Sequence, residues 1–277
     1  IINGADFKQR AENNRIIQTN LPASRGLIYD RSGYLLVDNT VSFSASIVPS
    51  LLPVNEQKRY RLYLYLEKIL DFPAIEIAKQ IEEFEKKVSQ SETLIIARNL
   101  SHKQALILEQ STPDLPGVTL EMDAQRTYLG GSALSHILGY MGAQTEIEWE
   151  ELKTKGYGFN ELIGKTGVEA YYENVLHGTP GKAITEINAN GSKIRILDEI
   201  GSLPGKNIHL SIDLKLQKYI TELLEQGRGE ASIAAAVVMD ANTGELLALV
   251  SLPNYDNNLF TSANRDQEYK KLLDDPN

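Results

Sequence analysis

The stretch Val41-Ser42-Phe43-Ser44-Ala45-Ser46-Ile47-Val48 alternates apolar side chains with serines, and this period of two predicts a half-buried strand. Two segments with helical periodicity follow it, at residues 55–70 and 74–88, and a proline-containing break at 71–73 separates them. Residues 93–97 return to a strand pattern. A strand, two helices and a strand in this irregular order, without an internal repeat, predict a mixed α+β fold.

Turn and cap signals extend this interpretation in both directions. Residues 25–33 predict a short strand that ends in a tight turn at Asp30–Gly33. Ser101–Gln104 and Thr145–Glu148 are capping-box patterns, which place the start of a helix at each position. Asn190-Gly191, with apolar residues alternating on both sides, predicts a β-hairpin with a type I′ turn.

The pattern changes after residues 201–205, where turn-forming residues cluster. Residues 208–212 predict a short strand, and Asp213 is placed to cap the helix that follows. Three apolar residues of that helix recur on one face, which is expected to be the buried one: Leu216, Ile220 and Leu223.

Two nearly continuous apolar runs, 234–239 and 246–250, surround a turn. Runs that are apolar on both faces are typical of strands covered on both sides. The residues after Ser251 are polar, so we expect them to leave this hairpin partly open, as in a chain that ends within a domain.

Composition excludes several classes of protein. The 277 residues carry 28 Lys and Arg against 37 Asp and Glu, and a formal net charge of −9 argues against a general nucleic-acid binder. The absence of cysteine excludes disulfides, thiol nucleophiles and cysteine-based zinc sites. The longest apolar run, Ile233–Met239, is far shorter than the roughly 18 residues that a transmembrane helix needs.

Catalytic patterns are incomplete. Lys165-Thr166-Gly167 matches a triplet of penicillin-recognising active sites, but no serine of the chain is followed by a lysine three positions later, so acyl transfer would lack its nucleophile. A phosphate-binding loop does not fit either, because five residues instead of four separate Gly158 from Gly164. We therefore interpret this triplet as a turn at a helix boundary. The four histidines lack metal-ligand spacing, and we expect no metal or cofactor.

Six segments, taken in order, resemble the class B penicillin-binding proteins, and within them the branch that acts in cell elongation. Three resemble motifs of the family's membrane-proximal pedestal, and three resemble the opening of its transpeptidase domain. In order along the chain, these segments are residues 25–33, 126–140, 164–178, 212–217, 243–248 and 251–260. Each signal alone is weak, but their joint order is specific.

The resemblance implies an elongated, non-catalytic pedestal with an inserted helical head subdomain, followed by the first strands and helix of a penicillin-binding transpeptidase domain. On this interpretation residues 1–20 are membrane-proximal, 21–205 form the pedestal (a dimerisation-type domain) with the head at about 50–116, and 206–277 begin the transpeptidase domain. The helical head would be a lobe that can move and transmit partner binding to catalysis.

The resemblance also implies residues that organise the pedestal or bind partners. They are Arg25, Gly26, Asp30, Arg31, Gly33, Arg126, Tyr128, His136, Gly139, Gly164, Gly167 and Glu169. The glycines at 26, 33, 139 and 164 are expected in turns with positive φ. The charged residues 25, 30, 31, 126 and 169 are expected to form an internal ion-pair network, and a direct partner contact is the alternative.

For the whole protein the resemblance implies a periplasmic peptidoglycan D,D-transpeptidase, with a single transmembrane anchor before Ile1 and a catalytic serine after Asn277. That serine would be acylated by stem peptides and by β-lactams, so this chain alone is expected to be inactive. The implied partners of the pedestal are a SEDS-family, RodA-like glycosyltransferase and a rod-shape scaffold protein. A septal relative and a stand-alone cell-wall interaction module are the alternatives.

Overall fold

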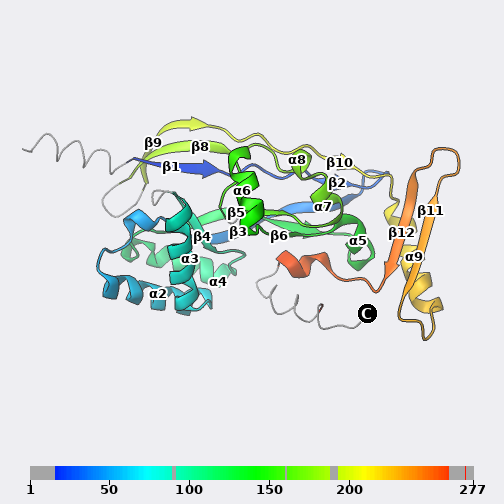
Figure 1. Cartoon of the computed structure of the whole chain (residues 1–277), viewed down its shortest axis with the longest axis horizontal. Coiled ribbons are helices and arrows are strands. Elements are labelled where there is room, and N and C mark those ends of the chain that lie inside the picture. Colours follow the sequence, from blue (N-terminus) through cyan, green and yellow to red (C-terminus); the bar gives the residue numbers. More distant parts are fainter. Residues whose placement is uncertain (1–15, 89–91, 160, 188–192, 262–271, 273–277) are drawn as a thin grey trace, which may run out of the picture.

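The computed structural model of the chain describes residues 16–88, 92–159, 161–187, 193–261 and 272. Figure 1 shows an elongated molecule, with a helical lobe near one end and a hairpin packed on a helix at the other. Helices and strands alternate irregularly between these ends, which confirms the mixed α+β class. Within the described ranges, no helix is long and apolar enough to cross a membrane.

The central sheet follows the order β10-β2-β3-β4, and β5 pairs with β3. The β2–β10 pair is parallel, whereas β3 is antiparallel to each of its partners. These strands are β2 (Ile28–Tyr29), β3 (Leu35–Ile47), β4 (Leu94–Ala97), β5 (Val118–Tyr128) and β10 (Ile208–His209). The strands predicted around 41–48 and 93–97 are thus confirmed.

Three smaller sheets complete the strands. An antiparallel sheet of order β1-β8-β9 runs along one side of the molecule, and β6 pairs with β7 and β11 with β12 in two sheets of two strands. The strands are β1 (Ile16–Leu21), β6 (Met141–Ala143), β7 (Leu162–Gly164), β8 (Gly181–Ile187), β9 (Lys193–Ile200), β11 (Ala234–Met239) and β12 (Leu246–Leu252). Antiparallel β8 and β9 flank the turn predicted at Asn190-Gly191, which itself lies outside the described residues.

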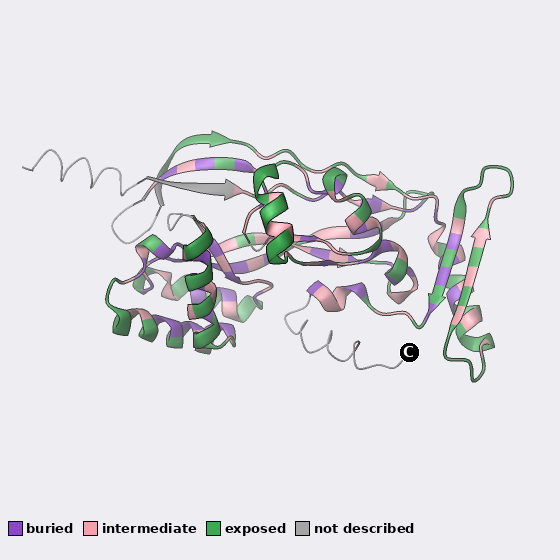
Figure 2. Ribbon diagram, viewed as in Figure 1, coloured by how far each residue is buried: buried purple, intermediate pink, exposed green. Residues whose placement is uncertain are grey.

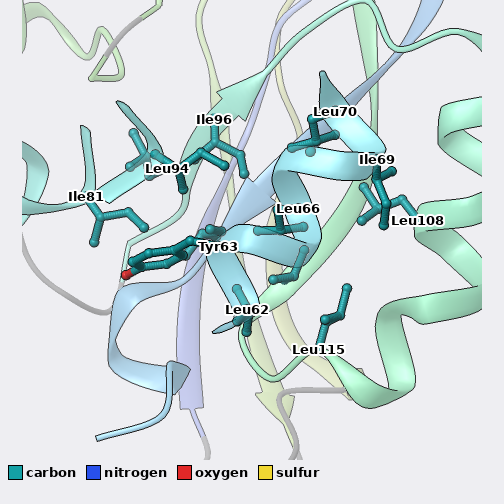
Figure 3. Packing of buried hydrophobic residues seen from close by; sticks show 14 of the residues in the cluster. Leu62, Tyr63, Leu66, Ile69, Leu70, Ile81, Leu94, Ile96, Leu108 and Leu115 are labelled. Carbon is teal, nitrogen blue, oxygen red and sulfur yellow. The ribbon is translucent and has the colours of Figure 1, made fainter. Parts of the chain in front are cut away.

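The helical lobe consists of α2 (Glu56–Leu70), α3 (Ala74–Lys87) and α4 (His102–Ser111), packed on β3, β4 and β5 (Figure 3). Leu66, Ile77 and Leu108 are fully buried there because the apolar stripes of the three helices face one another. A second cluster lies under the other half of the central sheet, around Ile28, Leu36 and Leu138. Strand β3 therefore contributes to both cores.

The remaining helices are short, except the last one. They are α5 (Ser135–Leu138), α6 (Glu146–Leu152), α7 (Gly167–Tyr171), α8 (Glu173–Leu176) and α9 (Leu214–Gly227), with 3-10 turns at Pro49–Leu51, Thr112–Asp114, Ser132–Leu134, Lys153–Lys155 and Asn257–Thr261. Both predicted capping boxes are present, at Ser101 before α4 and at Thr145 before α6. Asp213 caps α9 by accepting two backbone N–H groups. The turn predicted at residues 165–167 also lies at a helix boundary, where α7 begins.

The predicted apolar stripe of α9 is only partly buried. Leu216 and Ile220 are half-buried and Leu223 is 48% exposed, whereas Gln217 and Thr221 are buried. The reason is hydrogen bonding, because the Gln217 amide bonds the backbone of β12 through both the N–H and the C=O of Leu249. A buried helix face can be polar when each of its polar groups has a partner.

The hairpin of β11 and β12 is covered on one face only. Residues Ala248, Val250 and Leu252 of β12 are buried, whereas Val237 and Met239 of β11 are 61% and 57% exposed. Figure 2 shows the same contrast between the two strands. The predicted open face is therefore present among the described residues.

Candidate functional site

Two arginines and two glutamates, which we call the charge cluster (Arg25, Arg126, Glu169 and Glu173), meet inside the protein. Arg25 Nε and Arg126 Nε donate to the two carboxylate oxygens of Glu169, at 2.8 and 2.7 Å. The Glu169 side chain is completely buried, and Glu173 adds a further bond of 2.6 Å to Arg25 Nη2. The cluster thus carries two charges of each sign, which offsets the cost of removing them from water.

Four separate parts of the chain supply the charge cluster. Arg25 precedes β2, Arg126 lies on β5, and the two glutamates lie on α7 and α8. Arg126 also donates from Nη1 to the carbonyl of Gly26 at 2.8 Å and to Asn39 Oδ1 at 2.9 Å. The cluster therefore joins the central sheet to the short helices.

Hydrogen bonds and opposite charges favour the ionised forms of Arg25 and Glu173 in the charge cluster. Burial alone would lower the pKa of Arg25, but the hydrogen bonds and charges of Glu173 and Glu169 outweigh it and raise that pKa above its ordinary range. Burial alone would raise the pKa of Glu173, but Arg25 lowers it. Arg25 and Glu173 are thus held in their ionised forms, and none of the four side chains of the cluster is arranged as a nucleophile or a proton donor.

Two of the four expected turn glycines serve another purpose. Gly33 and Gly139 have φ values of +84° and +72°, as expected. Gly26 and Gly164 do not have positive φ, so that part of the prediction is wrong. A Cβ at Gly26 would lie 2.0 Å from the carbonyl oxygen of Lys206, and one at Gly164 would lie 2.2 Å from the backbone of Glu169. These glycines permit two backbone segments to approach each other.

Within the third pedestal motif, residues 164–178, helix α7 begins at Gly167, which has a φ of +59°. A Cβ there would lie 2.6 Å from the carbonyl oxygen of Ile137, in the second motif. Conversely, a Cβ at Gly139 would lie 2.0 Å from the carbonyl oxygen of Thr166. The second and third motifs are therefore in direct backbone contact.

Asp30 and Arg31 lie outside the charge cluster, contrary to the expected network. Asp30 is buried and its carboxylate accepts backbone N–H groups of Ser32, Tyr34 and Leu214. It organises the turn because an aspartate at this position satisfies the free amides of the turn itself. The Arg31 side chain is exposed to solvent.

Tyr128 and His136 lie beside the segment that follows β12, residues 253–261, which we call the strap. The backbone of Tyr128 bonds the side chain of Asn258, and His136 Nε2 is 3.0 Å from the carbonyl oxygen of Pro253. Burial raises the pKa of the Tyr128 phenol well above its ordinary value. Sequence reasoning assigned no role to four residues that hold these segments together. They are Glu173, Gln217, Asn257 and Asn258, and each lies in one of the segments that carry the family resemblance.

A cavity of about 480 Å³ lies between the helical lobe and the pedestal side of the central sheet. Phe84, Met122 and Phe159 line it together with the ion pair of Arg98 and Asp123. Among the residues that the structure describes, no group of three or more acidic or histidine side chains could hold a metal ion. The cavity is thus mixed in character, with apolar and charged walls.

His177 lies at the edge of this cavity with both ring nitrogens next to oxygen atoms. Nε2 is 2.6 Å from Glu161 Oε1, and Nδ1 is 3.0 Å from the carbonyl oxygen of Gly178. The ring also stacks on Tyr157 at 3.8 Å between centroids. Burial alone would lower the pKa of His177, but Glu161 outweighs it and raises that pKa above about 6.5.

Residues 20–210 match the family described as the penicillin-binding protein dimerisation domain. The chain belongs to this family. Its sequence is also similar, over nearly its whole length, to curated peptidoglycan D,D-transpeptidases named MrdA, and the class B resemblance is thereby confirmed.

The relatives are longer than this chain. MrdA of Haemophilus influenzae is 37% identical, and the match covers 99% of this chain and 41% of that protein. MrdA of Escherichia coli K12 is 36% identical, and the match covers 100% of this chain and 43% of that protein. Penicillin-binding protein 3 of Bacillus subtilis is 32% identical, and the match covers 98% of this chain and 38% of that protein. The chain thus spans about two-fifths of the length of these relatives.

Among solved structures, the complex between PBP2 and MreC from Helicobacter pylori has a similar fold. The TM-score is 0.70 at 24% sequence identity, and the match covers 94% of this chain and 47% of that one. At this level of identity the likeness concerns the fold.

Proposed function

We propose that these residues are the non-catalytic part of a periplasmic peptidoglycan D,D-transpeptidase of cell elongation, and that they position its catalytic domain. The observation that carries the proposal is the identity of 36–37% to MrdA proteins along the whole chain. No serine of the chain has a lysine three positions later, so the acylated serine would belong to a part of the protein beyond these residues.

Within this proposal, residues 21–205 are the pedestal and its head spans about 50–116. Residues 206–277 begin the transpeptidase domain, and residues 1–20 are membrane-proximal, next to an inner-membrane anchor. The charge cluster is consistent with a structural role of the pedestal, because it fixes four chain segments and offers no reactive group. The helical lobe has its own core and could shift as a body.

The proposed partners are a rod-shape scaffold protein and a RodA-like SEDS glycosyltransferase. The first is supported by the fold shared with a PBP2 that is solved together with MreC. The second rests on the family resemblance alone. Stem peptides and β-lactams would react only with the whole protein, and the acidic composition argues against nucleic acid as a partner.

A chimera tests the proposal. The matching 43% of Escherichia coli MrdA would be replaced by these 277 residues and expressed in cells depleted of their own MrdA. We expect rod-shaped growth and labelling of the chimera by fluorescent penicillin. A chimera carrying Lys86→Ala, a change at an exposed ion pair, is the control and should behave identically. Round cells that contain normal amounts of penicillin-labelled chimera would contradict the elongation role.

A further inference from the structure

The strap returns from the hairpin along the edge of the central sheet, back toward the helical lobe (Figure 1). It begins at Pro253, next to His136, and ends at the buried Thr261. Its contacts with the pedestal include ring contacts of Tyr255 and Phe260 and several side-chain hydrogen bonds to backbone atoms. Such bonds fix position more strictly than apolar contacts do, because they depend on direction as well as distance.

Two consecutive asparagines attach the middle of the strap. Asn257 is completely buried, and its Nδ2 donates to the carbonyl oxygens of Ser135, at 3.1 Å, and Gly139. The Asn258 amide bonds both the N–H and the C=O of Tyr128, at 2.9 and 3.0 Å. This side chain therefore takes the place of a neighbouring strand at the end of β5.

At the end of the strap, Phe260 stacks on Tyr140, and the carbonyl oxygen of Thr261 accepts two hydrogen bonds. Asn99 Nδ2, from the loop between β4 and α4 of the helical lobe, donates to it. Gln125 Nε2, from β5, donates to the same oxygen at 3.3 Å. Lobe, central sheet and strap thus meet at one acceptor.

Contacts with β3, outside the strap, orient the Asn99 amide toward Thr261. Its backbone has a φ of +55°, a left-handed conformation that asparagine tolerates better than most residues. Its Oδ1 accepts the hydroxyl of Ser42 on β3 at 3.0 Å, which leaves Nδ2 directed away from that strand. The next backbone amide, of Leu100, bonds the carbonyl of Phe43.

The opposite end of the strap is equally well defined. Gln217 of α9 donates to the carbonyl oxygen of Ala133 at 2.7 Å and bonds Leu249 of β12 in both directions. The hairpin is therefore tied to the pedestal just before the strap begins. Any displacement of the lobe at Asn99 acts on a segment whose other end holds α9, β11 and β12.

From this arrangement we infer that Asn99 and Gln125 are positioning residues, which set the placement of the α9 and β11–β12 unit relative to the helical lobe by holding Thr261. The mechanical part of the inference needs only this chain. Its consequence for acylation rests on the proposed function, in which that unit begins the transpeptidase domain.

Hydrogen exchange of the full chain tests the mechanical part. Asn99→Asp keeps the acceptor for Ser42 and tolerates the left-handed backbone, but it loses the donor to Thr261. We expect exchange of the Tyr128 and Leu259 amides to accelerate about fivefold or more, in line with the loss of one hydrogen bond, while amides of α3 stay unchanged. Asn99→Gly, which also permits positive φ, should give the same result.

Matched controls distinguish loss of the hydrogen bonds at Thr261, which we call the joint, from a general loss of stability. Ser42→Ala removes the bond that orients Asn99 but keeps the donor to Thr261, so it should accelerate these two amides less than Asn99→Asp does. Because Gln125 shares the acceptor, Gln125→Glu should accelerate the same amides and be non-additive with Asn99→Asp. Coupling is reciprocal, so Asn258→Ala should accelerate exchange at Leu100. Unchanged exchange at Tyr128 and Leu259, or equal acceleration throughout the lobe, would overturn the inference.

Penicillin acylation of the whole native protein tests the consequence. We expect Asn99→Asp to change the acylation rate constant by about threefold or more at an unchanged melting temperature, which a purely structural residue would not do. An unchanged acylation rate together with accelerated exchange of the Tyr128 and Leu259 amides would show that these bonds position the strap without affecting acylation. This result would overturn the link to acylation. If the wild-type protein itself is not acylated, the proposed function fails, and the exchange experiment still decides the joint.

Discussion

Arg25 and Glu169 are 144 positions apart in the sequence, yet they form a hydrogen-bonded ion pair of 2.8 Å inside the protein. Arg126 shares the same carboxylate, so a single buried glutamate neutralises parts of two guanidinium groups. The pedestal therefore depends on Glu169 more than on any one of the exposed acidic residues around it.

Replacement of Glu169 by glutamine should destabilise the protein by about 3–5 kcal/mol, because it leaves buried arginine charge without its counter-ion. Urea unfolding monitored by circular dichroism measures this change. Glu82→Gln, in the exposed pair with Lys86, is the control and should leave the midpoint unchanged. A Glu169→Gln protein as stable as the wild type would mean that the charge cluster contributes little.

Gly26→Ala should cost about 3 kcal/mol or more, since its Cβ would meet the carbonyl oxygen of Lys206 at 2.0 Å. The thermal midpoint of the purified variant measures the effect. Gly201→Ala is the matched control, because a Cβ there has open space around it. Equal midpoints for the two variants would show that the backbone segments can separate without cost.

Leu66→Ala should destabilise the helical lobe by about 2–5 kcal/mol, because it opens a cavity in a fully buried cluster (Figure 3). Leu64→Ala, on the exposed side of the same helix, should cost less than about 1 kcal/mol. Denaturant unfolding of both variants gives the comparison. Similar losses for both leucines would contradict the assigned orientation of α2.

The contribution of His177 to stability should depend on pH. Both of its ring nitrogens lie next to acceptors, so the protonated ring makes both bonds and the neutral ring only one. Its folded pKa is raised, so this stabilisation is complete below about 6.5 and is lost as the pH rises through the folded pKa. The ring contacts Tyr157, and its pKa responds to Glu161 and to Glu173, the latter of which is itself paired with Arg25.

Unfolding of the wild type and of His177→Gln between pH 5.5 and 8.5 tests this dependence. We expect the difference in unfolding free energy to be largest at the acidic end and to shrink toward the basic end. A difference that stays constant over this range would show that the bond to Glu161 does not depend on the charge of the ring.

Local patterns predicted the elements well, because a helix or strand carries its periodicity within a short window. The strand at 41–48, the two helices that follow it and the capping boxes at Ser101 and Thr145 are all where the sequence placed them. The turn at Gly33 was also predictable, because the residues that make it are neighbours.

Contacts between distant segments were not predictable in the same way. Gly26 has no local feature that distinguishes it from a turn glycine, because the carbonyl that excludes a side chain there belongs to Lys206. The apolar stripe at Leu216, Ile220 and Leu223 predicted the buried face of α9 only in part, because hydrogen bonds of Gln217 bring that residue to the centre of the buried face. The charged residues at 25, 126 and 169 were brought together, while Asp30 and Arg31 were not.

Strands β3 and β5 pair without interruption, from Val37 opposite Tyr128 to Ile47 opposite Val118. The two hydrophobic clusters lie at opposite ends of this ribbon, so its length sets the distance between them at roughly 30 Å. One inserted residue in β3 would turn every later side chain to the opposite face, whereas two would preserve the faces and lengthen the spacing. An insertion of two residues in each strand of this ribbon would therefore move the two hydrophobic clusters apart while leaving the inward-facing residues of both unchanged.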